Sequence, residues 1–252
     1  MNTKLADGRF RVAGAAVTGA RHLRAARNGQ DAVAVWAGDE AAAIVVCDGC
    51  SAGASSEVGA RFGASLIVRT LADRLAAGAR PGDDALWTEL RARVARAIES
   101  VAAQLPDGGL ADCFMFTIVA AAATRDDAAV WMLGDGAYAL DGDTHELGPF
   151  ADNQPPYLAY DLLGEPRFAH FAPAPHGCRT IAIATDGARD LACSLAYFAT
   201  PRFFTHPDAL RRELAVHARA GDRIDWDARR VSRVPAQLQD DCAIAVLHRE
   251  AA

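Results

Sequence analysis

The segment AAAIVVCDGCSAG, residues 41–53, joins an apolar run to a carboxylate. The run over 41–47 has no polar side chain and is rich in β-branched residues, which predicts a buried β-strand. Asp48 and Gly49 end the strand, and small polar residues follow. An Asp-Gly pair after a strand is typical of a turn, because aspartate bonds its own backbone and glycine tolerates positive φ. A turn alone would explain one such pair.

Composition indicates a folded protein with a sizeable core. The 252 residues are 51% hydrophobic and 23% charged, which argues against general disorder. The formal net charge is −6, whereas nucleic-acid-binding proteins usually carry a basic stripe, so we expect no nucleic-acid partner. The sequence has no low-complexity linker and no repeat. We therefore expect one domain over 1–252, with its core at about 10–249.

The cysteines and the apolar segments indicate where the protein works. No signal-peptide pattern opens the chain, so we expect a cytoplasmic protein with reduced cysteines. Cys47 and Cys50 form a CxxC, but no second CxxC or nearby histidine completes a zinc site. The longest apolar stretch, residues 113–123, is too short to span a bilayer, so we expect no membrane partner.

Strands and helices follow one another in an order that favours antiparallel sheets. Runs rich in valine, isoleucine and alanine predict strands at 31–37, 41–47, 115–124, 128–133, 180–185 and 242–248. Helical spacing of apolar residues predicts helices at 55–78, 83–105 and 207–221, with another after Asp186. Two successive helices and short turns between the middle strands argue against βαβ alternation. They favour antiparallel sheets with helices packed outside them.

Aspartates recur at the edges of the predicted strands. Those that follow a strand and precede glycine are Asp48, Asp135 and Asp186, and those that precede a strand are Asp31, Asp240 and Asp241. They could be separate turns, but a cluster of carboxylates is also tolerated where it binds a hard cation. His22 is the only close histidine, which favours magnesium or manganese over zinc. Two such ions would suit the hydrolysis of phosphate esters.

Six motifs in this order resemble those of the metal-dependent type-2C serine/threonine protein phosphatases. GARHLRAARNGQDAVAV (19–35) is similar to the opening motif of a bacterial branch, in which Gly-x-x-His leads into Gln-Asp-Ala. The next motifs are VVCDGCSAGASSEVGARFGASLI (45–67), VWMLGDGAYAL (130–140) and DNQPPYLAYDLLG (152–164). The last two are IAIATDGARDL (181–191) and DDCAIAVL (240–247). The resemblance covers roughly Gly19 to Leu247.

This resemblance implies a fold and an activity. The fold would be α+β, a four-layer αββα sandwich of two mainly antiparallel sheets flanked by helix pairs. The activity would be hydrolysis of phosphoserine and phosphothreonine by direct attack of a metal-bound hydroxide, without a phospho-enzyme. The substrate would be a phosphorylated protein, and the enzyme would oppose a serine/threonine kinase.

The resemblance also assigns metal ligands by position. Asp48 would bridge two Mg²⁺ or Mn²⁺ ions, and the carbonyl of Gly49 would bind one of them. Asp186 and Asp240 would complete the protein ligands of the other ion. Asp135 matches an aspartate that is associated with a third, weaker ion in some members.

The resemblance also implies catalytic residues, and two positions differ from the motifs of many family members. Asp31 would hold metal-bound water, and His22, Arg24 and Arg27 are the candidates for contacting phosphate. Gln30 stands where many members have glutamate, and residues 241–243 read Asp-Cys-Ala where many have asparagine and threonine. These departures leave open a catalytically weak or silent phosphatase-like module that binds a phosphoprotein or a regulatory partner. A related hydrolase of small phosphate esters is also open.

Overall fold

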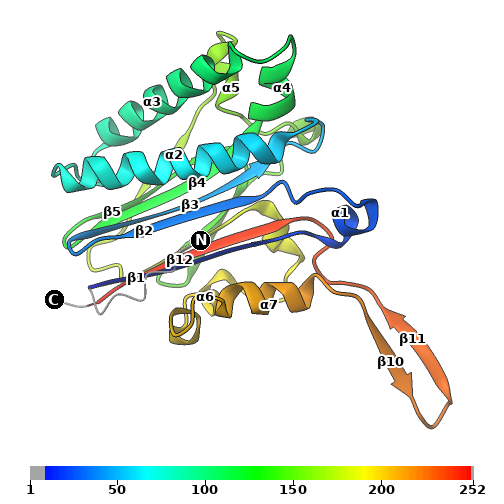
Figure 1. Ribbon diagram of the computed structural model, residues 1–252. Coiled ribbons are helices and arrows are strands. Elements are labelled where there is room, and N and C mark those ends of the chain that lie inside the picture. Colours follow the sequence, from blue (N-terminus) through cyan, green and yellow to red (C-terminus); the bar gives the residue numbers. More distant parts are fainter. Residues whose placement is uncertain (1–8, 251–252) are drawn as a thin grey trace.

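A computed structural model describes residues 9–250 of the protein, which form four layers (Figure 1). Two antiparallel five-stranded sheets lie face to face, and helices cover the outer face of each. The first sheet has the strand order β1-β12-β9-β6-β7 and the second β2-β3-β4-β5-β8. The expected α+β sandwich is confirmed.

Each sheet combines strands that are distant in the sequence. The first sheet contains β1 (Phe10–Val17), β12 (Cys242–Arg249), β9 (Thr180–Ala184), β6 (Gly136–Leu140) and β7 (Asp143–Leu147). The second contains β2 (Ala32–Ala37), β3 (Ala41–Gly49), β4 (Phe116–Thr124), β5 (Ala128–Leu133) and β8 (His170–Pro173). The two ends of the described chain, in β1 and β12, are therefore neighbours in one sheet.

Helices form the two outer layers. The second sheet is covered by α2 (Ser56–Ala76) and α3 (Asp84–Ala102), with α4 (Gly109–Phe114) and α5 (Ala159–Leu162) beside them. The first sheet is covered by α7 (Ala209–His217), α6 (Leu195–Phe198) and a 3₁₀ helix at Pro201–Phe204. The remaining elements are α1 (Ala20–Ala25), 3₁₀ helices at Ala151–Asn153 and Asp186–Asp190, and the hairpin of β10 (Gly221–Asp225) and β11 (Arg230–Val234).

Strand β3 lies between β2 and β4 in the second sheet, with apolar layers on both of its faces. Val45 and Cys47 pack toward α2 and α3, whereas Ile44 and Val46 face the first sheet. A strand covered on both faces requires an apolar run without alternation, which is what the sequence supplies. Because side chains alternate along a strand, Asp48 lies on the same side as Ile44 and Val46, toward the space between the sheets.

Small side chains let the two sheets approach closely. Strand β4 carries four consecutive buried alanines, residues 120–123. Ala121 and Ala123 face the first sheet. In β1, a Cβ added to Gly14 would lie 2.7 Å from a methyl carbon of Val33 in β2. The space between the sheets therefore has no room for larger side chains at these positions.

The chain crosses from the second sheet to the first between β5 and β6. Gly134 and Gly136 have φ values of +108° and +131° there, a conformation that glycine adopts without steric cost. A Cβ on Gly134 would also lie 2.5 Å from the Cβ of Thr117. The crossing therefore places Asp135 at the junction of the two sheets.

All six predicted strands and the helices predicted at 55–78 and 83–105 are present, with bounds shifted by at most three residues. The helix predicted at 207–221 is shorter, because Gly221 begins β10. The helix expected after Asp186 is present only as two short pieces, the 3₁₀ helix at Asp186–Asp190 and the one-turn α6. Among the described residues, no helix is long and apolar enough to cross a bilayer.

Ala121→Met should destabilise the protein because the added atoms have no space between the sheets. Overpacking of a close-packed core costs about 1–3 kcal/mol. The free energy of unfolding from urea titration measures the effect. Ala92→Met on the exposed face of α3 is the matched control and should change stability little. Equal stability of the two variants would contradict the tight packing described here.

Candidate metal centre

Loops at one end of the sandwich bring together the aspartates that the sequence singled out. A cavity of about 530 Å³ opens there, lined by Asp48, Gly49, Asp135, Asp186 and Asp240 together with residues of the 152–160 segment. Asp48 ends β3 in the second sheet, whereas Asp186 and Asp240 adjoin β9 and β12 in the first. Both sheets therefore supply carboxylates to one acidic cavity.

Asp31 lies buried beside this cavity and connects strands of the two sheets. The hydroxyl of Thr185 donates to Asp31 Oδ2 at 2.5 Å, and the backbone N–H of Ala243 donates to the same hydroxyl at 2.9 Å. The carboxyl groups of Asp31 and Asp48 are within hydrogen-bonding reach of each other. Thr185 belongs to the Thr-Asp-Gly motif, but its role as a bridge between β2 and the first sheet depends on the folded arrangement.

The carboxyl groups of the cluster are hard to ionise together. Burial raises the pKa of Asp31 to about 8, and repulsion from Asp241 and Asp186 adds to the effect. Burial, then the charges of Asp31 and Asp186, raises the pKa of Asp48 well above its ordinary range. Burial and the neighbouring Asp186 raise the pKa of Asp135 to about 6. At neutral pH the cluster must therefore hold either protons or a cation.

The chemistry of these donors fits a hard divalent cation. Asp48 is within hydrogen-bonding reach of both Asp31 and Asp186, so adjacent carboxyl groups must share protons when no cation is bound. A divalent ion replaces such protons and prefers carboxylate, carbonyl and water oxygens. All the acidic side chains that line the cavity offer oxygen only. The residues present therefore suit Mg²⁺ or Mn²⁺ better than a soft metal.

Gly49 is fixed by the close approach of β3 to the start of α2. A Cβ at Gly49 would lie 2.8 Å from the hydroxyl oxygen of Ser56 and 2.9 Å from its backbone. The Gly49 N–H donates to the carbonyl of Gln30 at 3.2 Å. Because Gly49 has no side chain, the end of β3 can lie against both Gln30, just before β2, and Ser56, the first residue of α2.

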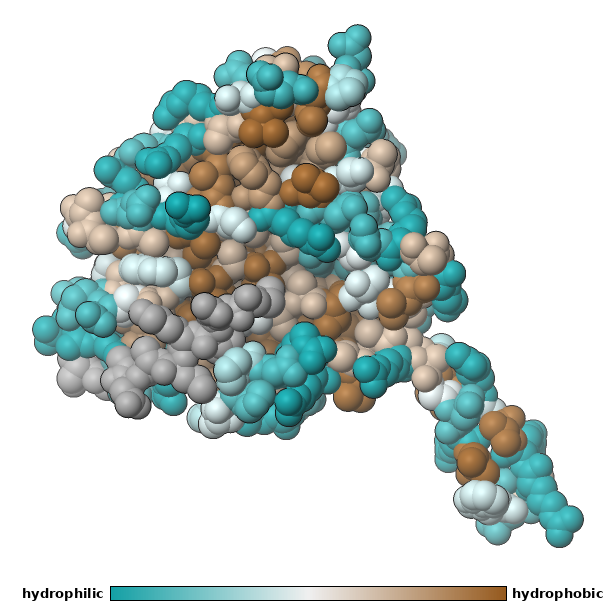
Figure 2. All heavy atoms as spheres, in the orientation of Figure 1, coloured by the Kyte–Doolittle hydropathy of each residue, from teal (hydrophilic) through white to brown (hydrophobic). Residues whose placement is uncertain are grey.

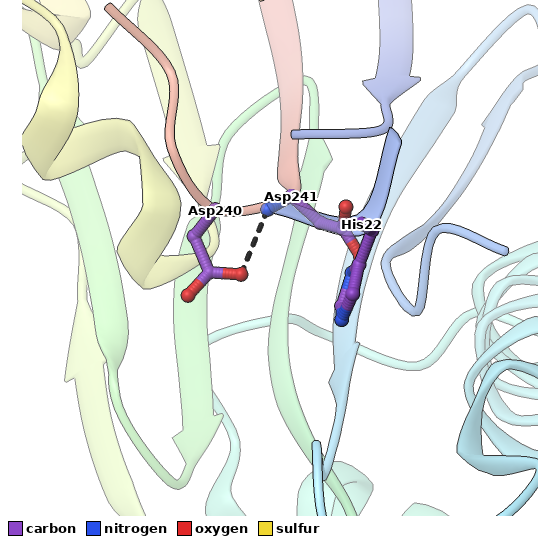
Figure 3. Close-up of side chains that lie close together, drawn as sticks. All are labelled: His22, Asp240 and Asp241. Carbon is purple, nitrogen blue, oxygen red and sulfur yellow. Dashed lines mark hydrogen bonds and ion pairs between the residues drawn. The ribbon is translucent and has the colours of Figure 1, made fainter. Parts of the chain in front are cut away.

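His22 and Asp241 form a hydrogen-bonded pair next to Asp240 (Figure 3). The His22 ring nitrogen Nδ1 lies 2.8 Å from Asp241 Oδ2, and ligand atoms of His22, Asp240 and Asp241 all lie within 4.8 Å of one another. Asp241 also accepts the N–H groups of Gly19 at 2.8 Å and Gln30 at 2.6 Å. These three partners already occupy its carboxylate, so we regard Asp241 as a structural anchor for the loop between β1 and β2.

The two departures from the family motifs have local physical reasons. The Gln30 amide donates to the Ser56 hydroxyl at 2.7 Å and to the Cys50 carbonyl at 3.3 Å, and a glutamate could not donate to that carbonyl. Gln30 thus points toward the start of α2. Its side chain does not face the acidic cavity, so having glutamine in place of glutamate does not change the charge of the cavity lining. The carboxylate of Asp241, which the family's asparagine would lack, is hydrogen-bonded to His22 and to two backbone N–H groups.

Arg21 is the basic residue of α1 that forms an ion pair with the acidic cluster, with its Nη1 4.0 Å from Asp240 Oδ2. Arg24 instead donates to the Gln239 side chain at 3.3 Å. Neither Arg21 nor His22, which pairs with Asp241, is among the residues that line the acidic cavity. The spacing of these residues in the sequence could not reveal which of them faces the cluster, because α1 is a single short helix.

Other residues at the cavity were not predicted as site residues from the sequence. Asp152, Gln154 and Thr117 line it, and Asp152 adds a further carboxylate. Tyr157 is buried against it, and that burial raises the pKa of its phenol, so the hydroxyl stays protonated. Asp152 lies in the Asp-Asn-Gln-Pro-Pro-Tyr motif, but only the folded chain shows that this segment reaches the carboxylates.

Comparisons with known proteins agree with this geometry. The profile of the protein phosphatase 2C family matches residues 18–220. The chain therefore belongs to the protein phosphatase 2C family, whose members are metal-dependent protein serine/threonine phosphatases. No curated protein matches its sequence.

Solved structures share the fold at low sequence identity. PppA, titled a key regulatory component of T6SS in Pseudomonas aeruginosa, is 17% identical, with 96% of this chain and 99% of that chain covered and a TM-score of 0.60. The catalytic domain of the serine/threonine protein phosphatase PstP, solved with two manganese ions, is 17% identical over 95% and 97%, with a TM-score of 0.54. A bacterial serine phosphatase is 12% identical over 96% and 98%, with a TM-score of 0.59.

Removal of divalent ions should make stability fall as pH rises. The pKa values of Asp31, Asp48 and Asp135 are raised in the fold, so the folded state holds more protons than the unfolded chain. Stability is then lost between about pH 4, where ordinary aspartates ionise, and about pH 8. Thermal unfolding in EDTA across this range measures the effect.

Two further measurements make this pH test specific. Added Mn²⁺ should raise the melting temperature more at the high-pH end, where the carboxylates are ionised. Asp135→Asn should flatten the metal-free profile because it removes one titrating group. A metal-free protein that is most stable at about pH 8 would contradict the proposed clustering.

Proposed function

We propose that the acidic cavity holds two Mg²⁺ or Mn²⁺ ions and hydrolyses phosphoserine and phosphothreonine in proteins. Asp48 would contact both ions, the carbonyl of Gly49 would contact one, and Asp186 and Asp240 would bind the other. Bound there, the ions would supply an activated water and positive charge for the phosphoryl group. A third, weaker ion at Asp135 is part of the same proposal.

The observation that carries this proposal is the meeting of Asp48, Asp186 and Asp240 from two different sheets in one cavity. Separate turns would have no reason to place mutually repelling carboxylates together. Asp31 would orient water beside the ions, since its own carboxyl is fixed by Thr185. Arg21 is suited to contact the phosphate, because its guanidinium is largely exposed and points to Asp240.

A second cavity supports a protein substrate over a small phosphate ester. This cavity, about 570 Å³, adjoins the acidic one and shares Asp152, Gln154, Pro155 and Tyr160 with it. Arg167 and Phe168 also line it, and Phe168 is 87% exposed. A peptide whose phosphorylated residue enters the acidic cavity could place its neighbouring side chains there.

The setting of the reaction belongs to the same proposal. A phosphatase of this family acts on phosphorylated proteins, and we propose that this one opposes a serine/threonine kinase in a signalling pathway. We also propose a cytoplasmic location. All six cysteines are free, which agrees with a reducing compartment.

Purified protein should hydrolyse a phosphothreonine peptide only with added Mn²⁺ or Mg²⁺. Asp48→Asn should lower kcat/KM by at least about 100-fold, because even changes around a catalytic metal's ligands cost about 10–100-fold. Phosphate release is the measurement. Asp126→Asn, an exposed aspartate in the β4–β5 turn, is the matched control. Metal-independent turnover, or equal activity of both variants, would rule out the proposed centre.

Phe168→Ala should distinguish the two substrate classes. Loss of the exposed ring should lower kcat/KM for the phosphopeptide by about 3- to 10-fold, because one apolar contact at a binding surface is worth about 1 kcal/mol. Turnover of p-nitrophenyl phosphate should stay unchanged. Val216→Ala on α7, an exposed apolar residue in the opposite helical layer, is the control. An equal loss on both substrates would argue against a peptide groove.

A further inference from the structure

The hairpin of β10 and β11 projects from the body of the protein and exposes apolar side chains (Figures 1 and 2). Every residue of its two strands is exposed. Ile224 and Val231 face each other across the ladder, at 50% and 64% exposure, and Trp226 beyond them is 80% exposed. A two-stranded hairpin with no core beneath it is marginally stable in water. A large exposed tryptophan on such an element is typical of an interaction surface.

A groove lies at the base of this hairpin. It has a volume of about 570 Å³ and is lined by Ala20, Leu23, Arg24, Ala218, Arg219, Ala220, Arg233, Pro235 and Ala236. Leu23 on α1 is 56% exposed beside it. Apolar residues and three arginines thus line the groove, and no acidic residue does. We call it the arginine groove.

The charged side chains of the groove and the hairpin indicate which kind of partner could bind there. Within residues 9–250, Arg219 and Arg233 form no ion pair, so their guanidinium groups are available to a carboxylate. The hairpin carries three aspartates at 222, 225 and 227, and four arginines at 223, 229, 230 and 233. The groove, lined by three arginines and by no acidic residue, is therefore the positively charged part of this region. A protein segment that carries both acidic and large apolar side chains complements the groove and the hairpin together.

The arginine groove is connected to the acidic cavity through the backbone. The N–H groups of Ala20 and Arg21 in α1 donate to the carbonyls of Leu238 and Gln239 at 3.1 and 3.0 Å. Gln239 is followed directly by Asp240 of the acidic cavity. A partner seated in the groove would therefore contact Ala20, whose N–H holds Leu238 two residues before Asp240.

We propose that the arginine groove and the β10–β11 hairpin form a docking surface for an acidic, apolar segment of a partner protein. Carboxylates of that segment would pair with Arg219 and Arg233, and its apolar side chains would cover Trp226, Ile224 and Leu23. This surface is separate from both cavities of the proposed phosphatase site, so the two proposals can fail independently.

The test selects short random peptides displayed on phage against the immobilised full-length chain, without regard to activity. Enriched peptides should combine Asp or Glu with aromatic or aliphatic residues. Their affinity, measured by fluorescence anisotropy, should fall by about tenfold or more on Arg219→Ser with Arg233→Ser, and likewise on Trp226→Ala. The matched control is Arg93→Ser with Arg96→Ser on the exposed face of α3. Thermal unfolding should show all variants folded.

Several outcomes would overturn the proposal. One is that no peptide is enriched, or that enriched peptides are basic or keep full affinity for both groove variants. Another is binding of phosphatidylserine vesicles or duplex DNA that depends on the same arginines when no acidic peptide binds. A third is a dimer, seen by sedimentation, that Trp226→Ala dissociates, because the occupant would then be a second copy of this chain.

Discussion

Mutual repulsion among carboxylates at the junction of two sheets is the constraint on which this structure depends. Asp48 is fixed by the end of β3, Asp135 by the crossing between the sheets, and Asp31 by Thr185. Each position is set by packing elsewhere, so the carboxylates cannot separate without disrupting the sandwich. A divalent cation would offset that repulsion. The carboxylates that destabilise the metal-free fold are therefore the same groups that could hold a metal for chemistry.

The sequence predicted what depends on short-range pattern. Strands β3 and β4 are continuous apolar runs because both of their faces are covered, and α2 and α3 show a clear helical period. Strand β1 was missed because Gly14 interrupts a run of small residues that reads weakly as a strand. The hairpin was missed because none of its residues enters the core.

The site was predictable only in part, for a related reason. Asp-Gly pairs after predicted strands marked Asp48, Asp135 and Asp186, and aspartates directly ahead of predicted strands added Asp240 and Asp31. The partners of these groups depend on long-range contacts, as with Thr185 against Asp31 and His22 against Asp241. Arg91 of α3 illustrates the same limit, because its two 2.7 Å hydrogen bonds go to Asp161 of α5, 70 residues further along the chain.

The alanines of β4 have a consequence for how this protein can vary through evolution. Positions 121 and 123 tolerate few exchanges, since a larger residue there needs simultaneous changes in the facing sheet. Neutral drift in the interior should therefore proceed through coupled pairs across the two sheets, while exposed positions of α3 such as Ala92 and Arg93 can change one residue at a time. Related sequences would then diverge fastest at exposed positions and most slowly at the interface between the two sheets.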